Sequence, residues 1–290
     1  MTYITRFRAY QLGSAGSLFS YYKPGEFTLI EARLPKAGLS VIVKEMLNCG
    51  TGTLNTLHIS SWDTDHCNYD DLLDILNQLR PNRIEVPSYE PTSEMGKLSK
   101  NTLEGYVDIH GRHLTYLDES FMDMLDRADR WGIDHVFYRS AYHSQNHNDM
   151  SLIKLFRSQG FNVASFGDCE SREISDRISF DGSILCSEMD VMILAHHGAN
   201  NGFTNIDFLR KTAPTFAICT SNYDNQFEHP KIEVRQMLHD LRIPLFTTKT
   251  GDVIVYQQSG VPEGYVFNLI SDNEKLSSKY RFTPKRISPI

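Results

Sequence analysis

The chain has 290 residues, of which 40% are hydrophobic, and a formal net charge of −7 at pH 7. These values predict one large domain with a sizeable core and exclude disordered, collagenous and disulfide-rich secreted proteins. We expect no membrane partner, because no apolar run approaches the roughly 18 residues of a spanning helix and the first residues lack the apolar segment of a signal peptide. The five cysteines are scattered and odd in number, which favours free thiols and a cytoplasmic location.

The charge is distributed unevenly along the chain. Residues 274–290 contain five Lys or Arg and one Glu, a net charge of +4, so residues 1–273 carry −11. We expect residues 1–273 to form the domain and residues 274–290 to be a basic C-terminal tail, solvated and kept irregular by its two prolines. The acidic body argues against a protein that coats duplex DNA, since neutralising phosphates requires clustered Lys and Arg.

Short apolar segments with turn signals between them predict many strands and a few helices. The predicted strands are 5–12, 18–22, 27–34, 54–60, 83–87, 135–139, 151–156, 161–166, 190–195, 215–220, 244–248 and 252–257. The predicted helices are 70–79, 119–131, 205–211 and 233–241, with a polar loop at 89–106. Strands in each half with helices between them predict an α/β fold of two sheets packed face to face and covered by helices.

Potential metal ligands follow four of the predicted strands. Asp63, Asp65 and His66 come directly after strand 54–60, and two carboxylates this close require a cation or a proton. One Asp-x-Asp alone is typical of an ordinary polar loop. Three further groups also follow strands, however: Gly167-Asp168, His196-His197-Gly198 and His229-Pro230. Strand ends fix the position of a ligand while the following loop exposes it, so the set predicts one metal site.

The order of these motifs resembles the metallo-β-lactamase superfamily, and within it the ComEC-like metallo-hydrolase domain of competence (DNA-uptake) proteins. The resemblance spans roughly residues 6–256. It rests on Ser60-Ser61-Trp62-Asp63-Thr64-Asp65-His66, Asn148-Asp149-Met150-Ser151-Leu152, Gly167-Asp168, His196-His197-Gly198 and His229-Pro230. It implies an αββα sandwich, two mixed sheets packed face to face with helices outside, and a centre of up to two divalent ions, Zn or Mn.

The resemblance also implies roles for individual residues. The implied metal ligands are Asp63, Asp65, His66, Asp168, His196, His197 and His229. Asp65 would orient or deprotonate the nucleophile, and His229 would bind metal or donate a proton to the leaving group. Adjacent residues at a strand end point in opposite directions, so the sequence leaves open which of His196 and His197 is the ligand.

Two positions depart from the family pattern. Ser61 stands where the motif has a histidine, and Glu31-Ala32-Arg33 stands where an early strand ends in an Asp-x-Gly-like segment. His58 is not expected to replace the missing ligand, because an offset of three residues along a strand points to the opposite face. We expect it to be a core or edge histidine. The departures leave open whether the chain binds one ion or two.

Two functions of different classes fit these observations. The first is a metal-dependent hydrolase, a phosphodiesterase or nuclease that acts on DNA, RNA or a small phosphoester through a metal-activated water, alongside a protein partner in DNA processing or defence. The second is a non-catalytic or weakly active metallo-fold subunit that binds a partner protein, which the loss of histidine at Ser61 motivates. Metal content separates the two.

Overall fold

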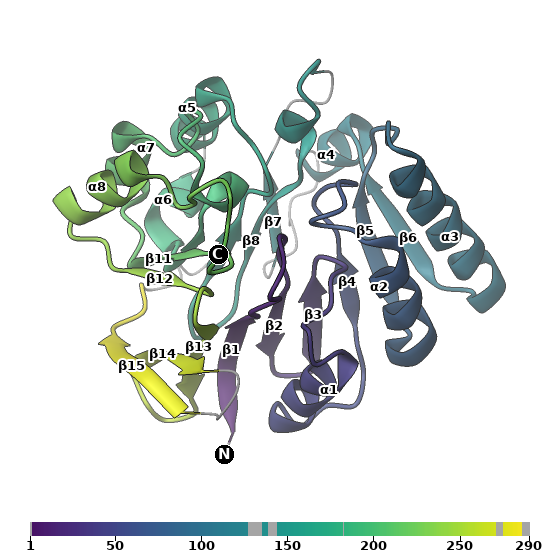
Figure 1. Ribbon diagram of the computed structural model, residues 1–290, viewed down its shortest axis with the longest axis horizontal. Coiled ribbons are helices and arrows are strands. Elements are labelled where there is room, and N and C mark those ends of the chain that lie inside the picture. The colour runs from purple at the N-terminus through teal and green to yellow at the C-terminus, as the bar shows by residue number, and fades with distance from the viewer. Residues whose placement is uncertain (1, 127–134, 139–143, 182, 271–274, 286–290) are drawn as a thin grey trace.

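Two mixed β-sheets pack face to face, and helices cover both outer faces (Figure 1). The computed structural model describes residues 2–126, 135–138, 144–181, 183–270 and 275–285. The αββα sandwich predicted from the sequence is therefore confirmed. None of the described helices combines the length and the apolar character needed to cross a bilayer.

The first sheet has nine strands. Their bounds are β1 (Tyr3–Ala9), β2 (Phe19–Lys23), β3 (Glu26–Ile30), β4 (Thr56–His58), β5 (Arg83–Pro87), β6 (His113–Leu117), β13 (Gly251–Gln258), β14 (Gly264–Ile270) and β15 (Lys275–Phe282). The order across the sheet is β15-β14-β13-β1-β2-β3-β4-β5-β6. The pairs from β15 to β3 are antiparallel, and those from β3 to β6 are parallel. The loop after β4 therefore leaves the parallel half.

The second sheet has six strands. Their bounds are β7 (His135–Tyr138), β8 (Ile153–Phe156), β9 (Val163–Ser165), β10 (Val191–Ile193), β11 (Phe216–Cys219) and β12 (Leu245–Thr247). Across the sheet they run β12-β11-β10-β9-β8-β7, with β9 to β12 parallel and β7 to β9 antiparallel. The carboxyl ends of β9, β10 and β11 consequently open at the same edge, where ligands bind in sheets of this kind.

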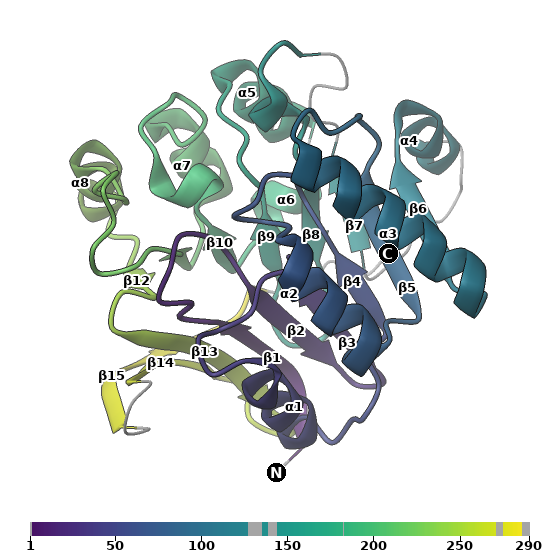
Figure 2. The same cartoon turned by 45° about the vertical axis from the view of Figure 1, so that its right-hand side comes forward.

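The helices form two separate outer layers. On the nine-stranded side are α1 (Leu39–Asn48), α2 (Tyr69–Asp74) with its π-helical continuation Ile75–Leu79, and α3 (Glu94–His110). Helix α4 (Glu119–Asp126) follows edge strand β6, and its Phe121 ring lies 5.9 Å from Phe137 of β7 in the other sheet. On the six-stranded side are α5 (Arg172–Asp181), α6 (Ser183–Glu188), α7 (Ile206–Thr212) and α8 (Ile232–Asp240). Figure 2 shows α1, α2 and α3 lying in front of the nine-stranded sheet. Each layer buries its own apolar cluster against a sheet, and a third cluster, which includes Phe7, Phe156 and Phe216, fills the space between the sheets.

Most predicted elements are present with bounds shifted by a few residues, but two predictions are wrong. Residues 89–106, predicted to be a loop, contain most of α3; its buried positions include Gly96 and Ser99, which give no apolar signal. The tail 274–290 was predicted to be irregular, but Lys275–Phe282 pairs with β14 as strand β15. The parts of the predicted helix and strand at 127–131 and 139 lie outside the described residues.

A buried ionic group sits between the two sheets. Lys154 on β8 contacts the Glu85 carboxylate on β5, and Nδ1 of His58 on β4 lies 2.9 Å from the same carboxylate. His58 and Lys154 are fully buried. His58 is thus a core histidine, as predicted, and the ion pair joins the two sheets through strands that each lie next to an edge strand.

Candidate metal centre

Four side chains from both sheets converge where the loops after β4, β9 and β10 meet. One ligand atom from each of Asp65, His66, Asp168 and His197 can be chosen so that all four lie within 4.8 Å of one another. His66 Nε2 lies 2.9 Å from Asp168 Oδ1, and His197 Nε2 lies 3.3 Å from Asp65 Oδ2. We call these four residues the four-ligand cluster. Of the two adjacent histidines, the structure places His197 in it.

The orientation of His66 is fixed by Glu31 at the end of β3. His66 Nδ1 lies 3.1 Å from Glu31 Oε1, while the Ser60 hydroxyl donates to the same oxygen at 2.6 Å. The Ser60 backbone N–H donates to the other oxygen of Glu31 at 2.9 Å. Because a carboxylate accepts, the hydrogen of His66 is assigned to Nδ1, which leaves the lone pair of Nε2 directed at Asp168. This is the arrangement of a metal-ligating histidine.

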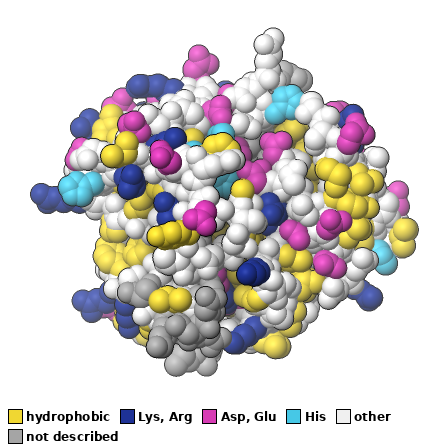
Figure 3. Space-filling model, viewed as in Figure 1, with side chains coloured by type: hydrophobic (Ala, Val, Ile, Leu, Met, Phe, Trp, Pro, Cys, Tyr) yellow, Lys and Arg dark blue, Asp and Glu magenta, His cyan; other side chains and the backbone are white. Residues whose placement is uncertain are grey.

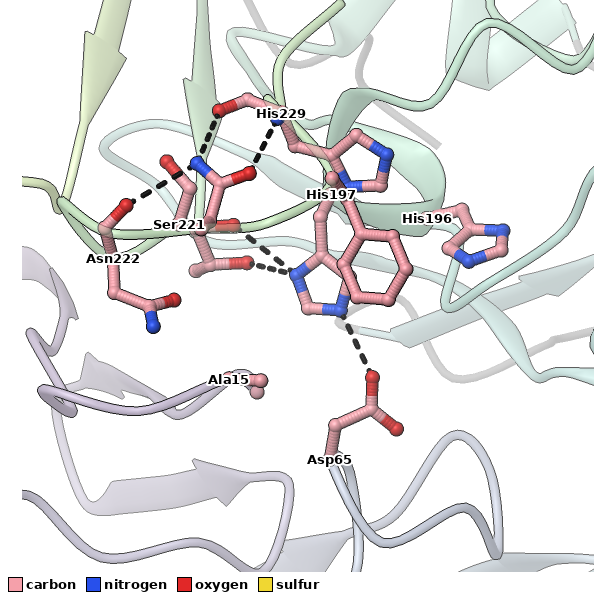
Figure 4. Close-up of a pocket in the computed structure, with 11 residues that line it drawn as sticks. Ala15, Asp65, His196, His197, Ser221, Asn222 and His229 are labelled. Carbon is pink, nitrogen blue, oxygen red and sulfur yellow. Dashed lines mark hydrogen bonds and ion pairs between the residues drawn. The ribbon is translucent and has the colours of Figure 1, made fainter.

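His197 is oriented in the same way by Thr220, which follows β11. Its Nδ1 lies 3.1 Å from the Thr220 backbone carbonyl oxygen and 3.0 Å from the Thr220 hydroxyl (Figure 4). That hydroxyl lies 2.8 Å from the hydroxyl of Ser17. A carbonyl oxygen only accepts, so Nδ1 carries the hydrogen and Nε2 presents its lone pair to Asp65. Both histidines therefore offer Nε2 to the same space.

The glycine of the Gly-Asp motif is required because its backbone lies close to Ser151. Gly167 has φ +52°, and a Cβ there would lie 2.6 Å from the Cβ of Ser151, so the position requires glycine. The Ser151 hydroxyl accepts a hydrogen bond from the Asp168 backbone N–H at 3.1 Å. The Asn-x-x-Ser-Leu segment thus positions Asp168 through its serine.

The His-His-Gly motif has an unusual backbone. His196 and His197 have φ of 45° and 52°, and Gly198 follows with φ of 81°. Left-handed conformations cost L-residues roughly 1–2 kcal/mol each, and such strain concentrates at functional sites. The turn is held by the N–H of His196, which donates to the Gly167 carbonyl at 3.0 Å, and by the N–H of Lys231, which donates to the Gly198 carbonyl at 3.0 Å.

The four-ligand cluster is strongly coupled electrostatically. Burial opposes ionisation of Asp65 and Asp168, but the positive charge of His66 outweighs it, and the pKa of each carboxyl lies below its usual value. Burial likewise opposes the charged form of His66 and His197, yet Asp168 and Asp65 raise the pKa of both rings. The carboxylates therefore attract positive charge to this point. A divalent cation supplies that charge in place of the two ring protons.

The residues present fit a metal ion. His66 Nε2 and Asp168 Oδ1 are both buried and lie 2.9 Å apart, and each has no partner other than the opposing charge of the other. Once the ring loses its proton, both atoms are left without a partner, at a cost of about 1–3 kcal/mol each, and a shared cation satisfies both. Two imidazole nitrogens and two carboxylate oxygens are a donor set suited to Zn and also to Mn.

Three residues that the sequence suggested as ligands lie outside the four-ligand cluster. Asp63 accepts a hydrogen bond from the Ser61 hydroxyl at 3.0 Å. His196 Nδ1 lies 2.7 Å from Glu170 Oε1. The ring of His229 is 6.4 Å from the ring of His197, centroid to centroid, and stands beside the cluster.

A cavity of about 170 Å³ opens next to the cluster. Asp65, His197 and His229 line it together with Ala15 on the facing loop (Figure 4). Burial and the neighbouring histidines His197 and His196 lower the pKa of His229 to about 4, so its ring is neutral at pH 7. Acidic and histidine side chains gather in the upper middle of the face shown in Figure 3.

Sequence reasoning missed the residues that orient the ligands. Glu31 was read only as a departure from the family pattern, although a charged residue at the end of the buried strand FTLI was a usable signal. Thr220 acts partly through its backbone carbonyl, which every residue type has. Glu170, by contrast, holds His196, which lies outside the cluster, and accepts from the side-chain amides of Asn146 and Asn148 at 2.8 and 2.9 Å.

Comparison with known proteins gives one relative and several similar structures. No protein-family model matches the chain. Competence protein ComA of Neisseria gonorrhoeae is 27% identical over 131 residues, which are 44% of this chain and 18% of ComA. A β-hydroxylase, CmlA (E377D mutant), has a TM-score of 0.55 at 11% identity, over 89% of this chain and 55% of CmlA. Igni18, a metallo hydrolase of Ignicoccus hospitalis, has a TM-score of 0.48 at 13% identity, over 86% of this chain and 98% of Igni18.

These similarities cover different shares of the proteins compared. The chain spans about a fifth of the length of ComA and about half of CmlA, and at 11% identity the structural likeness to CmlA concerns the fold alone. ComA is a competence protein, the class of protein that the motif order in the sequence also resembles. In fold and in motifs, the chain resembles the metallo-β-lactamase superfamily and its ComEC-like competence branch, and it carries a candidate metal centre.

Proposed function

We propose that the chain is a metal-dependent phosphodiesterase or nuclease that cleaves DNA, RNA or a small phosphoester. The observation that carries the proposal is the four-ligand cluster, in which the buried atoms His66 Nε2 and Asp168 Oδ1 have only each other as partners. When bound, a divalent ion would lower the pKa of a water and polarise a phosphoryl oxygen. The competence protein in the comparison and the motif order support a nucleic acid as substrate.

The chain's own residues would divide the remaining work. His66, Asp168 and His197 would hold the ion, with Glu31 and Thr220 fixing the two rings. Asp65 faces both the cluster and the cavity, so it would orient the attacking water and accept its proton.

His229 would act beside the leaving group. Its ring lines the cavity, and Asn225 fixes its backbone by accepting from its N–H at 2.6 Å and donating to its carbonyl at 3.0 Å. With a pKa of about 4, the neutral ring would donate a hydrogen bond to the leaving oxygen as imidazole and not as imidazolium.

Metal content and hydrolysis together test the proposal. We expect at least one ion of zinc or manganese per chain by elemental analysis, and hydrolysis of bis(4-nitrophenyl) phosphate and of single-stranded DNA. Asp168→Asn should lose both the ion and the activity. Asp207→Asn is the matched control, because Asp207 is exposed, pairs with Arg172 at 2.9 Å and does not belong to the four-ligand cluster.

The same experiment separates the enzyme from a binding subunit. Ser61 lies in the ligand loop, where its hydroxyl lies 3.0 Å from both Asp63 Oδ2 and the Tyr89 hydroxyl. If the purified chain holds no ion after incubation with manganese, or if Asp168→Asn leaves hydrolysis unchanged, the catalytic proposal fails. A metallo-fold subunit that binds a partner protein would then be the better description.

A further inference from the structure

A stack of aromatic rings leads from the four-ligand cluster toward solvent. The His197 and His229 rings have centroids 6.4 Å apart and planes 11° apart. The His229 and Phe227 rings follow at 5.7 Å and 26°. Phe227 is nevertheless 55% exposed. Its exposed surface is available to another planar group.

The position of Phe227 connects this exposed ring to the proposed reaction. Phe227 and Asp65 line the same cavity of about 170 Å³. Sites that enclose a whole small ligand typically measure about 300–1,000 Å³, so this cavity holds only one part of a substrate. A ligand whose reacting group lies at Asp65 therefore has its next group beside Phe227.

The wall that carries Phe227 is internally braced. The Asn225 side-chain amide donates to the backbone carbonyls of Asn222 and His229 at 3.2 and 3.0 Å (Figure 4). Because these bonds close the loop on itself, Phe227 is presented from a preformed turn, and less ordering is required on binding.

Asn222 adds a polar group to the same wall. Its side chain lines the cavity, and its amide has no hydrogen-bond partner among the described residues. A carboxamide offers one acceptor and two donors, the combination that pairs with the edge of a nucleobase. An aromatic face can stack on a flat ring, and the carboxamide in the same wall can bond to nitrogen and oxygen atoms at the edge of that ring. This combination suits a heteroaromatic ring better than an alkyl chain.

We propose that Phe227 and Asn222 form a nucleobase-binding site, in which a base stacks on Phe227 while its own phosphate reaches the four-ligand cluster. This inference rests on the proposed function and narrows its substrate to nucleotides and single-stranded nucleic acid. A base in a duplex is already stacked and paired, so duplexes would bind only at frayed ends.

The affinity of the manganese-loaded protein for two small phosphates tests the site. Adenosine 5′-monophosphate carries a base and ribose 5-phosphate does not, and both are measured by isothermal titration calorimetry. We expect the nucleotide to bind about 5- to 150-fold more tightly, the range of base–aromatic stacking. Phe227→Ala should remove that difference without changing ribose 5-phosphate binding, and Phe227→Tyr should retain it.

The controls keep the two proposals apart. Tyr223 lies in the same loop, is 77% exposed and does not line the cavity, so Tyr223→Ala should bind both phosphates as the unmodified protein does. Phe227→Leu replaces Phe227→Ala if the latter unfolds. The base site is overturned if the two phosphates bind with equal affinity, or if Phe227→Ala loses the same factor of affinity for both. Either result leaves the phosphoesterase proposal standing. Failure of ribose 5-phosphate to bind contradicts the proposed function as well.

Discussion

Replacement of Glu31 by Gln is the most direct test of how the centre is built. Glu31 is buried, has φ +70°, and receives three contacts, from His66 Nδ1, the Ser60 hydroxyl and the Ser60 backbone N–H. In Glu31→Gln one of the two oxygens becomes an amide nitrogen, which cannot accept a hydrogen bond. In one orientation of the amide the ring of His66 loses its acceptor, and in the other it keeps only an uncharged one, so the bond that holds the ring is weakened in both cases.

The expected loss of metal affinity follows from this geometry. A hydrogen bond to a charged group contributes about 1.5–3 kcal/mol, and loss of a residue that orients a ligand lowers metal affinity about 10- to 100-fold. The two ranges agree, since tenfold is about 1.4 kcal/mol. The measurement is calorimetric titration of the metal-free protein with manganese at fixed pH, after thermal unfolding has shown that the variant folds.

Glu170→Gln is the matched control for this experiment. Glu170 holds His196 at 2.7 Å, and neither residue belongs to the four-ligand cluster. We expect its manganese affinity to change by about twofold or less. If Glu31→Gln binds manganese as tightly as the unmodified chain, or if Glu170→Gln loses as much affinity as Glu31→Gln, the assignment of Glu31 as the residue that orients His66 is refuted.

Three further predictions concern stability and pH. Gly167→Ala should lose metal and about 1–3 kcal/mol of unfolding free energy in urea titrations, because its Cβ would lie 2.6 Å from the Cβ of Ser151 at φ +52°; unchanged metal content would contradict this. Glu85→Gln should cost about 3–5 kcal/mol in the same assay by leaving buried Lys154 without its carboxylate, and a loss below about 1 kcal/mol would show that the pair is dispensable. Burial raises the pKa of Asp190 from 3.8 to about 7, so between about pH 4 and pH 7 the folded protein binds a proton at Asp190 that the unfolded chain has released. The contribution of Asp190 to the free energy of unfolding therefore falls as the pH rises through this range. Asp190→Asn should therefore reduce the difference in unfolding free energy between pH 5 and pH 7. An unchanged difference would contradict the raised pKa of Asp190.

The strands and the ligand motifs could be predicted from the sequence because both depend on the local pattern of residues. The strands that hold the site are short buried apolar segments, and a polar motif directly after each one is visible without a structure. Helix α3 was missed for a physical reason. Gly96 and Ser99 face inward, and a Cβ on Gly96 would lie 2.8 Å from the Cβ of Pro91, so close packing there uses small residues and not apolar ones.

The remaining errors concern long-range partners. Strand β15 pairs with β14, and its Phe282 packs on the ring of Phe216 at 5.1 Å, contacts that no local pattern in a lysine-rich segment reveals. The choice between His196 and His197 was likewise not local. The left-handed turn and the carbonyl of Thr220, which bring His197 into the four-ligand cluster, both depend on how distant loops meet.

The division of the four-ligand cluster between the two sheets has a consequence for the whole molecule. His66 and His197, two of the residues proposed to hold the ion, are 131 residues apart along the chain and belong to loops of different sheets. An ion bound to both would act as a cross-link, comparable to a bond that closes a long loop of the unfolded chain. An ion present at about 100 times its dissociation constant would add about 2.7 kcal/mol to the free energy of unfolding. Chelation should then separate the edges of the sandwich at the ligand loops before its apolar interior opens, so that hydrogen exchange would report loss of the metal first in the turns after β4 and β10.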